Sequence, residues 1–92
     1  MIRTHPETGR KSVFVNEMFT LRIAGLHAHE SDALLSMLYA HCVRQEYTCR
    51  LHWEPGTLAI WDNRCVHHYA MDDYHTFDRE MIRVAVAGDI PR

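Results

Sequence analysis

Apolar residues recur at helical spacing in only one part of the chain, residues 31–44, and this spacing predicts a helix there. The apolar stripe consists of Leu34, Leu35, Leu38, Tyr39 and Cys42. Ser31 is the predicted N-cap, because a serine hydroxyl can accept a hydrogen bond from a free backbone N–H of the first turn. Arg44 suits the negative end of the helix dipole.

The remainder of the chain favours extended segments. Apolar and polar residues alternate from Tyr47 to Trp53, which is the period of a half-buried strand. Further strands are expected at residues 12–15, 57–61, 65–70 and 79–87. Residues 16–26 are also expected to be extended. Residues 5–10, with Pro6 early and Gly9 late, predict a loop between two extended pieces.

Several short strands with one helix predict a mainly β fold with a helical insert, in the α+β class. Four or five strands can form half of a two-layered sandwich but hardly a closed one. Strand edges and an apolar face would stay open, which predicts self-association as a homo-oligomer or poor solubility. At 92 residues, the chain is near the lower limit for a self-sufficient core, and it looks like part of a larger domain.

Composition excludes several classes of protein. The hydrophobic fraction of 47% and the charged fraction of 24% are ordinary for a globular protein. A net charge of −2 offers no electrostatic footprint for nucleic acid. No apolar run approaches the roughly 20 residues of a membrane span. The first residues lack an apolar signal core, so a cytoplasmic location is expected. The three cysteines show no C-x-x-C spacing and are expected to be free thiols.

Candidate chemistry concentrates in residues 61–70 and in the two arginines that follow, Arg79 and Arg83. The adjacent His67 and His68 are metal-capable, and strand alternation points them in opposite directions. Arg79 and Arg83 would share a face of a strand, with alpha carbons about 13 Å apart. That separation suggests two anionic groups, or the two ends of one ligand. The simplest alternative is an exposed pair of charges that protects a strand edge.

A series of motifs extends this pattern over essentially the whole chain. They are His5-Pro6-x-Thr8-Gly9-Arg10, Phe14-Val15-Asn16, Trp53-x-Pro55-Gly56, Trp61-Asp62-Asn63-Arg64, His68-Tyr69-Ala70-x-x-Asp73-Tyr74, Arg79-x-x-x-Arg83 and Gly88-Asp89. In order and spacing the chain resembles the C-terminal part of the TauD/TfdA family of iron(II)- and 2-oxoglutarate-dependent dioxygenases. This resemblance implies that residues 1–92 are the C-terminal segment of an incomplete double-stranded β-helix (jelly-roll) domain.

The resemblance also implies roles for individual residues. His68 matches the distal histidine of a two-histidine, one-carboxylate iron site, whereas His67 falls at a variable position. Arg79 matches the arginine that pairs with the far carboxylate of 2-oxoglutarate. Arg83 matches an arginine that contacts an acidic group of the substrate or the near end of the cosubstrate. Trp53 and Trp61 fall where the family places aromatic residues around the site, and both are expected to pack there. The implied reaction consumes dioxygen, hydroxylates a small acid such as a sulfonate or aryloxyacid, and releases succinate and carbon dioxide.

The chain departs from the family pattern in its metal ligands. The family's other two ligands form a His-x-Asp/Glu motif upstream, and no such motif stands in the corresponding place here. On its own, the chain is therefore expected to bind iron weakly and to be inactive. The sequence His27-Ala28-His29-Glu30 is metal-capable but lies in an expected surface turn. The other histidines, at positions 5, 41, 52 and 75, are interpreted as surface or structural.

Three interpretations of different classes follow. The chain is the C-terminal part of a dioxygenase, or a non-catalytic remnant that acts by association, or a small cupin-like metal protein that uses His27, His29 and His68. An upstream His-x-Asp in the same reading frame would favour the first, and a true start at Met1 would favour the second.

Overall fold

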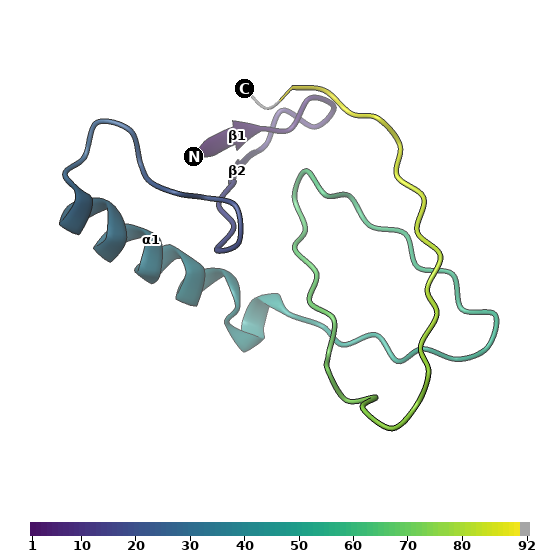
Figure 1. Ribbon diagram of the computed structural model, residues 1–92. Coiled ribbons are helices and arrows are strands. Elements are labelled where there is room, and N and C mark those ends of the chain that lie inside the picture. Colours follow the sequence, from purple (N-terminus) through teal and green to yellow (C-terminus); the bar gives the residue numbers. More distant parts are fainter. Residues whose placement is uncertain (91–92) are drawn as a thin grey trace.

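The computed structural model describes residues 1–90, whose regular elements are two short strands and one long helix (Figure 1). Strands Ile2–Thr4 (β1) and Lys11–Val13 (β2) form an antiparallel hairpin. Helix Ala28–Cys42 (α1) follows, and a single 3₁₀ turn, Gln45–Tyr47 (η1), comes after it. The combination of helix and antiparallel strands agrees with the α+β class.

The hairpin holds the N-terminal part of the chain together. Its register pairs Ile2 with Val13, Arg3 with Ser12, and Thr4 with Lys11. The loop closes by two backbone bonds, from the His5 N–H to the Arg10 carbonyl (2.8 Å) and from the Gly9 N–H to the His5 carbonyl (2.9 Å). Gly9 has φ 67°, a value that residues with a Cβ seldom adopt. The predicted loop at residues 5–10 is confirmed, and the strand expected at residues 12–15 is the shorter β2.

The predicted helix is confirmed, but its N-terminus lies elsewhere than expected. α1 begins after His27, the N-cap, and the His27 N–H donates to Oε2 of Glu30 at 2.9 Å. The prediction of Ser31 as N-cap is wrong. Ser31 is buried within the helix, and its Oγ accepts a hydrogen bond from the Ile23 N–H at 2.8 Å. The hydroxyl therefore fixes the preceding loop rather than the helix end. At the other end the helix stops at Cys42, before Arg44.

The loop before α1 supplies the partner for the helix's apolar stripe. Leu35 and Val15 are the buried apolar side chains of the described chain, and the rest of the stripe is half-buried. The Tyr39 hydroxyl donates to the Thr20 carbonyl at 3.2 Å. The extended structure expected for residues 16–26 is interrupted by a turn at Asn16–Thr20. The Asn16 side chain accepts from the Met18 N–H at 2.9 Å, which favours a local turn.

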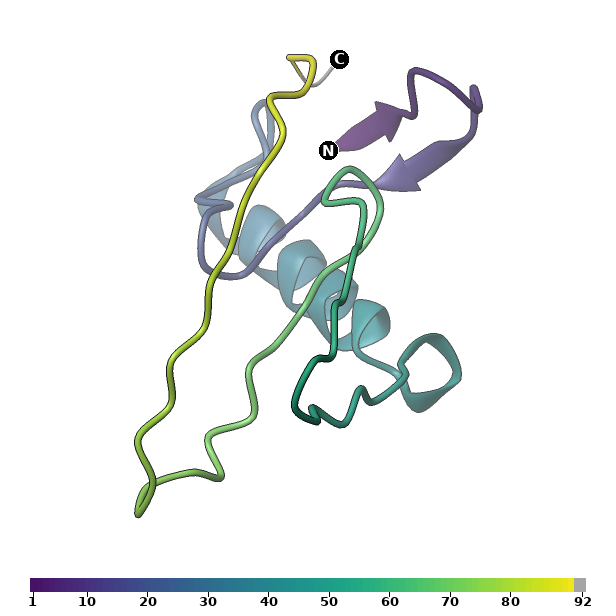
Figure 2. The same cartoon turned by 90° about the vertical axis from the view of Figure 1, so that its right-hand side faces the viewer.

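Residues 48–90 form extended segments and turns with neither helix nor strand (Figures 1 and 2). The strands expected at residues 47–53, 57–61, 65–70 and 79–87 are thus wrong for this structure. The chain reversals between them are present, because backbone bonds close turns at Glu54–Thr57, Asp62–Cys65 and Tyr74–Phe77. A turn needs only local partners, whereas a strand needs the backbone of a second segment. No helix in the described part is long and apolar enough to cross a membrane.

Replacing Ser31 with alanine tests the link between the loop and α1. Ser31→Ala should destabilise α1 by about 1–2 kcal/mol relative to Ser36→Ala, because only the former removes the buried hydroxyl that accepts from the half-buried Ile23 N–H. Ser36 is an exposed serine of the same helix, so it controls for the change in helix propensity. Urea unfolding followed by far-ultraviolet circular dichroism measures the difference. Equal midpoints for the two variants would contradict the account.

Candidate functional site

The three residues expected to bind metal and anions lie on two extended segments. His68 belongs to the segment after the Asp62–Cys65 turn, and Arg79 and Arg83 belong to the segment after the Tyr74–Phe77 turn. The two segments run in opposite directions in both views (Figure 2). All three side chains are exposed.

The His68 ring is held on one side by an aromatic neighbour. The Trp61 and His68 ring centroids are 4.8 Å apart, with the planes tilted by 45°. The Trp61 indole is fixed in turn, because its Nε1–H donates to Oδ1 of Asn63 at 2.9 Å. Trp61 is half-buried, whereas Trp53, for which packing was also expected, is exposed. The contact limits the orientations of the imidazole and leaves its ring nitrogens free of protein partners among the described residues.

Arg79 and Arg83 differ in their surroundings. The Arg79 guanidinium lies over the Tyr74 ring, with Cζ 4.8 Å from the centroid. This cation–π contact uses the face of the guanidinium and leaves its N–H edges available. Within residues 1–90, neither Arg79 nor Arg83 has a carboxylate within salt-bridge distance. An anion from outside this part of the chain would meet no competing carboxylate at either side chain.

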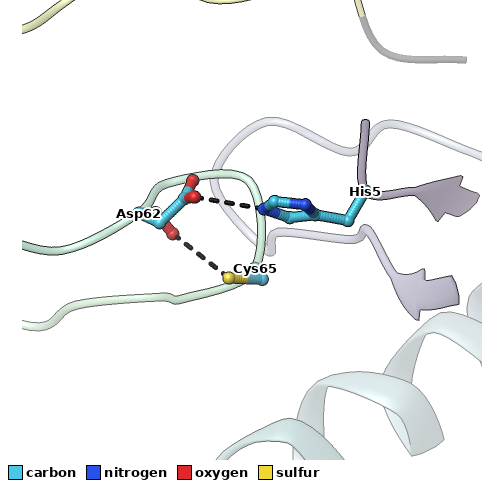
Figure 3. A group of neighbouring side chains, drawn as sticks. All are labelled: His5, Asp62 and Cys65. Atoms are coloured by element: carbon cyan, nitrogen blue, oxygen red, sulfur yellow. Dashed lines mark hydrogen bonds and ion pairs between the residues drawn. The ribbon is translucent and has the colours of Figure 1, made fainter. Parts of the chain in front are cut away.

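A second group of metal-capable side chains lies between the hairpin loop and the 62–65 turn (Figure 3). Ligand atoms of His5, Asp62 and Cys65 lie within 4.8 Å of one another. His5 Nε2 is 3.2 Å from Oδ2 of Asp62, and the Cys65 thiol donates to the Asp62 backbone carbonyl at 3.8 Å. The sequence interpretation of His5 as a structural histidine missed these partners, because Asp62 lies 57 positions away.

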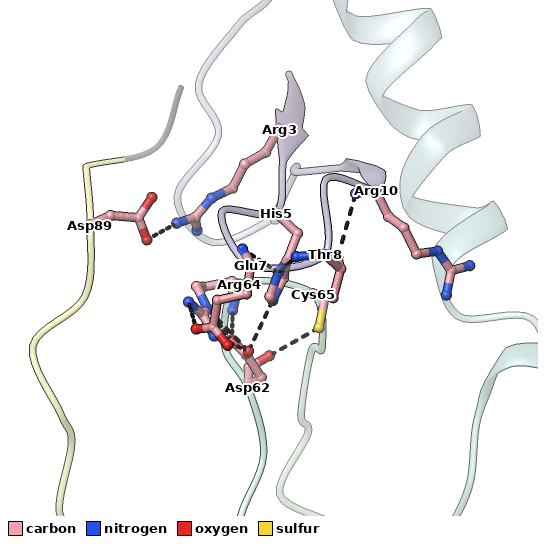
Figure 4. A network of polar contacts seen from close by, with 9 residues as sticks. All are labelled: Arg3, His5, Glu7, Thr8, Arg10, Asp62, Arg64, Cys65 and Asp89. Atoms are coloured by element: carbon pink, nitrogen blue, oxygen red, sulfur yellow. Dashed lines mark hydrogen bonds and ion pairs between the residues drawn. The ribbon is translucent and has the colours of Figure 1, made fainter.

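The carboxylate of this group, that of Asp62, is already hydrogen-bonded to Arg64 (Figure 4). Its Nε donates to both oxygens of Asp62 (2.9 and 3.0 Å), and its Nη2 donates to Oδ2 at 2.7 Å. These bonds, the backbone N–H of Arg64 and the bond from His5 together hold the pKa of Asp62 far below its usual range. Asp62, and with it Glu7, whose carboxylate accepts from Nη1 at 2.9 Å, raises the pKa of Arg64.

The tautomer of His5 also opposes metal binding. The backbone N–H groups of Glu7 and Thr8 both donate to Nδ1 at 3.3 Å, so Nδ1 offers a lone pair and Nε2 carries the proton. Nε2 then donates to Asp62. A cation would have to displace the guanidinium from the carboxylate and the proton from the imidazole. We therefore interpret His5, Glu7, Asp62 and Arg64 as an ion-pair clamp rather than a metal centre.

A second tie joins the hairpin to the end of the described chain. Arg3 is buried, and its Nη2 donates to Oδ1 of Asp89 at 2.9 Å while its guanidinium lies 5.0 Å from the Phe14 ring centroid (Figure 4). Desolvation acts to raise the pKa of Asp89, but hydrogen bonds from Arg3 and from its own backbone N–H outweigh it and leave the pKa lowered. Arg3 and Asp89 were not expected as a pair. The sequence alone does not show that an arginine in a short strand is buried, so this pair could not be predicted from it.

The metal-capable His27-x-His29 pair is not assembled into a larger group. The two rings stack at 6.1 Å, at the N-terminus of α1. In the described part of the chain the only cluster of three metal-capable side chains is the one around Asp62. The cupin-like alternative, in which these two histidines join His68, therefore has no support from the geometry. The His-x-Glu spacing at His5–Glu7 likewise serves the clamp, since Glu7 is bonded to Arg64.

Neutralising Asp62 tests the clamp through its pH dependence. A lowered folded-state pKa means that the contact is intact above the ordinary carboxylate value of about 3.9 and is lost as pH falls through the folded value. The Arg64 Nε–H resonance should therefore stay constant from neutral pH to about pH 4 and move only below it. Asp62→Asn should shift this resonance at every pH, and Asp73→Asn, at an exposed carboxylate, should leave the profile unchanged. A wild-type midpoint near the ordinary carboxylate value would contradict the clamp.

Comparison with known proteins gives the family. Residues 1–85 match the model of "Taurine catabolism dioxygenase TauD, TfdA family". An alpha-ketoglutarate-dependent sulfate ester dioxygenase of Pseudomonas putida is 42% identical over 91 residues, which cover 99% of this chain and 30% of that protein. A putative alpha-ketoglutarate-dependent sulfonate dioxygenase of Schizosaccharomyces pombe is 41% identical over 92 residues, covering 99% and 24%. The (S)-phenoxypropionate/alpha-ketoglutarate-dioxygenase of Sphingobium herbicidovorans is 36% identical over 89 residues, covering 97% and 31%.

These coverages mean that the chain spans between about a quarter and a third of the length of the curated relatives it matches. No solved structure matches. The family match includes the clamp, His68, Arg79 and Arg83 in one continuous alignment. The chain belongs to the TauD/TfdA family of taurine catabolism dioxygenases.

Proposed function

We propose that this chain is the C-terminal segment of the jelly-roll domain of an iron(II)- and 2-oxoglutarate-dependent dioxygenase. In this proposal residues 1–92 supply one iron ligand, His68, and two anion-binding side chains, Arg79 and Arg83. The observation that carries the proposal is the continuous family match over residues 1–85, which spans all three. The intact site hydroxylates a small acidic substrate.

His68 fits the role of one metal ligand among three. An imidazole nitrogen is a suitable ligand for iron(II), and the Trp61 contact restrains the ring while its nitrogens stay unpaired. A single histidine does not hold iron firmly, so the other ligands of a facial triad must come from polypeptide outside these residues. When bound, iron(II) supplies the centre at which dioxygen and 2-oxoglutarate react.

Arg79 suits the far carboxylate of 2-oxoglutarate. A guanidinium binds a carboxylate through two parallel N–H bonds, and the Tyr74 ring beneath it leaves those N–H groups free. Tyr74 also restricts the side chain, which lowers the entropy lost when an anion binds. Arg83, four residues on, is left for a second anionic group, either the acidic group of the substrate or the near end of the cosubstrate.

The proposed substrate class follows from the charge of Arg83 and from the relatives' names. Those relatives are described as dioxygenases of sulfate esters, of sulfonates and of (S)-phenoxypropionate, and every one of these substrates carries an acidic group. The proposed reaction converts the substrate, dioxygen and 2-oxoglutarate into hydroxylated product, succinate and carbon dioxide. The alternative proposal is a non-catalytic interaction module, which the presence of one triad ligand in 92 residues would suit.

Exchanging neighbouring histidines for alanine tests the metal role. The protein for this experiment is a single polypeptide in which this chain replaces the matched 91 residues of the Pseudomonas putida relative. His68→Ala should lower 2-oxoglutarate-dependent succinate formation at least about 100-fold, because the iron loses a ligand. The matched control, His67→Ala, should change the rate less than about threefold, since strand alternation turns that ring away. Equal rates for the two variants would remove His68 from the site.

Arginine-to-lysine exchanges separate cosubstrate binding from substrate binding. Arg79→Lys should raise the KM for 2-oxoglutarate about 10- to 100-fold, because lysine cannot make the bidentate contact. Arg83→Lys should raise chiefly the KM for an alkyl sulfate substrate. Arg50→Lys, at an exposed arginine outside the proposed site, is the control and should change neither constant. An unchanged 2-oxoglutarate KM in Arg79→Lys would refute the assignment.

A further inference from the structure

Asn63 makes a side-chain bond that the turn around it does not require. The 62–65 turn is closed by two backbone bonds to the Asp62 carbonyl, at 3.1 and 3.0 Å. Its capping side chain is also Asp62, whose Oδ1 accepts from the Arg64 N–H at 2.8 Å. In the described chain only glycines have a positive φ, so the backbone at position 63 does not favour asparagine over other residues. The amide of Asn63 is therefore available for another partner.

The partner of Asn63 is the indole of Trp61. The Trp61 Nε1–H donates to Oδ1 of Asn63 at 2.9 Å, and within residues 1–90 this is the hydrogen bond that the Asn63 side chain makes. An indole N–H can only donate, so the amide oxygen, and not the amide nitrogen, faces Trp61. The indole can take two broad orientations about its Cβ–Cγ bond, and a flip would carry Nε1 away from the amide. The bond therefore selects one orientation of the indole.

The orientation of the indole determines the surface against which His68 lies. The two ring centroids are 4.8 Å apart and the planes are tilted by 45°, which is within the range of favourable aromatic contacts. Trp61 is half-buried and His68 is exposed, so the indole is the more restricted ring of the two. Because the indole is asymmetric, a flip would change the part of it that the imidazole contacts. Asn63 therefore acts on the imidazole through Trp61.

We propose that Asn63 is a positioning residue for the metal ligand: its amide oxygen holds the Trp61 indole in the orientation that restrains the His68 imidazole. Its effect on iron rests on the metal role proposed above for His68. A restrained imidazole loses less freedom when a metal binds, so removal of the restraint should weaken metal binding about two- to tenfold. The bond is exposed to water, which keeps its contribution modest and the effect well below that of losing a ligand.

NMR of the 92-residue chain tests the geometry without metal. The ring current of an indole 4.8 Å away shifts the carbon-bound imidazole protons of His68. Asn63→Leu, which has no acceptor, should move these signals toward those of Trp61→Leu, in which the indole is absent. Asn63→Asp keeps an oxygen at the same place and should leave the His68 ring signals close to those of the wild type. Unchanged His68 ring signals in Asn63→Leu would overturn the proposal.

Calorimetric titration with iron(II) in the absence of oxygen tests the effect on the metal. The protein is the polypeptide in which this chain replaces the matched residues of the Pseudomonas putida relative. Asn63→Leu should weaken iron(II) binding by the amount given above, and Asn63→Asp should bind iron(II) at least as tightly as the wild type. Gln45→Leu, at an exposed amide outside the proposed site, controls for the added apolar side chain and should have no effect.

A Trp61→Phe background separates positioning from a role in the turn. Phenylalanine keeps an aromatic ring but has no N–H, so Asn63→Leu should weaken iron(II) binding no further there. A further loss of the same size in this background would assign Asn63 to the turn alone and overturn the proposal. If His68→Ala bound iron(II) as tightly as the wild type, the proposed function of His68 would fail instead. The His68 ring signals would then still decide whether Asn63 positions the imidazole.

Discussion

The ion pair between Arg64 and Asp62 is the centre of the network that ties the 62–65 turn to the N-terminal hairpin. It joins side chains two positions apart and so costs little chain entropy, yet it also fixes the carboxylate to which His5 donates and the guanidinium to which Glu7 binds. Through these two residues, a local turn becomes attached to the N-terminal hairpin. Individual exposed ion pairs stabilise little, but a bidentate arginine within a network is the favourable case.

The clamp and the Arg3–Asp89 pair together close a long loop. Residues 62 and 89 are both tied to the hairpin, so the two extended segments between them begin and end at the same place (Figures 1 and 4). The clamp lies next to Trp61, whose ring contacts His68. The candidate metal ligand therefore lies six positions after the clamp residue Asp62, against a tryptophan that Asn63 holds in place. Arg79 and Arg83 lie in the second half of this loop, on the segment that leads to Asp89.

Sequence predicted the parts of this structure that form from local interactions. The helix over residues 31–44 and the loop over residues 5–10 needed only periodicity and turn residues. The helix start was missed because Ser31 bonds Ile23, in the preceding loop, and no helical pattern reveals that partner. The strands were missed for a different reason. Alternation predicted a strand at residues 79–87, but pairing requires a second backbone, and the described residues provide none for it.

The candidate site divides in the same way. His68, Arg79 and Arg83 were selected by motif spacing, and their open surroundings leave those roles as proposals. The clamp could not be predicted, because His5 and Asp62 are 57 positions apart in sequence and motif spacing does not show that they meet. Only the local part of the clamp had a signal in the sequence. Asp62 and Arg64 stand two positions apart in the 62–65 turn, and both the backbone N–H and the Nε–H of Arg64 donate to Oδ1 of Asp62.

The most direct test of the account is histidine NMR of the polypeptide in which this chain replaces the matched residues of the Pseudomonas putida relative. Iron(II) is added in the presence of 2-oxoglutarate. With ¹⁵N-labelled histidine, assigned by single alanine substitutions, each of the chain's eight imidazoles reports separately. The account predicts that the His68 ring signals broaden first and most strongly, while those of His5 remain. Broadening of His5, or of His27 and His29, with His68 unchanged would place the metal elsewhere and contradict it.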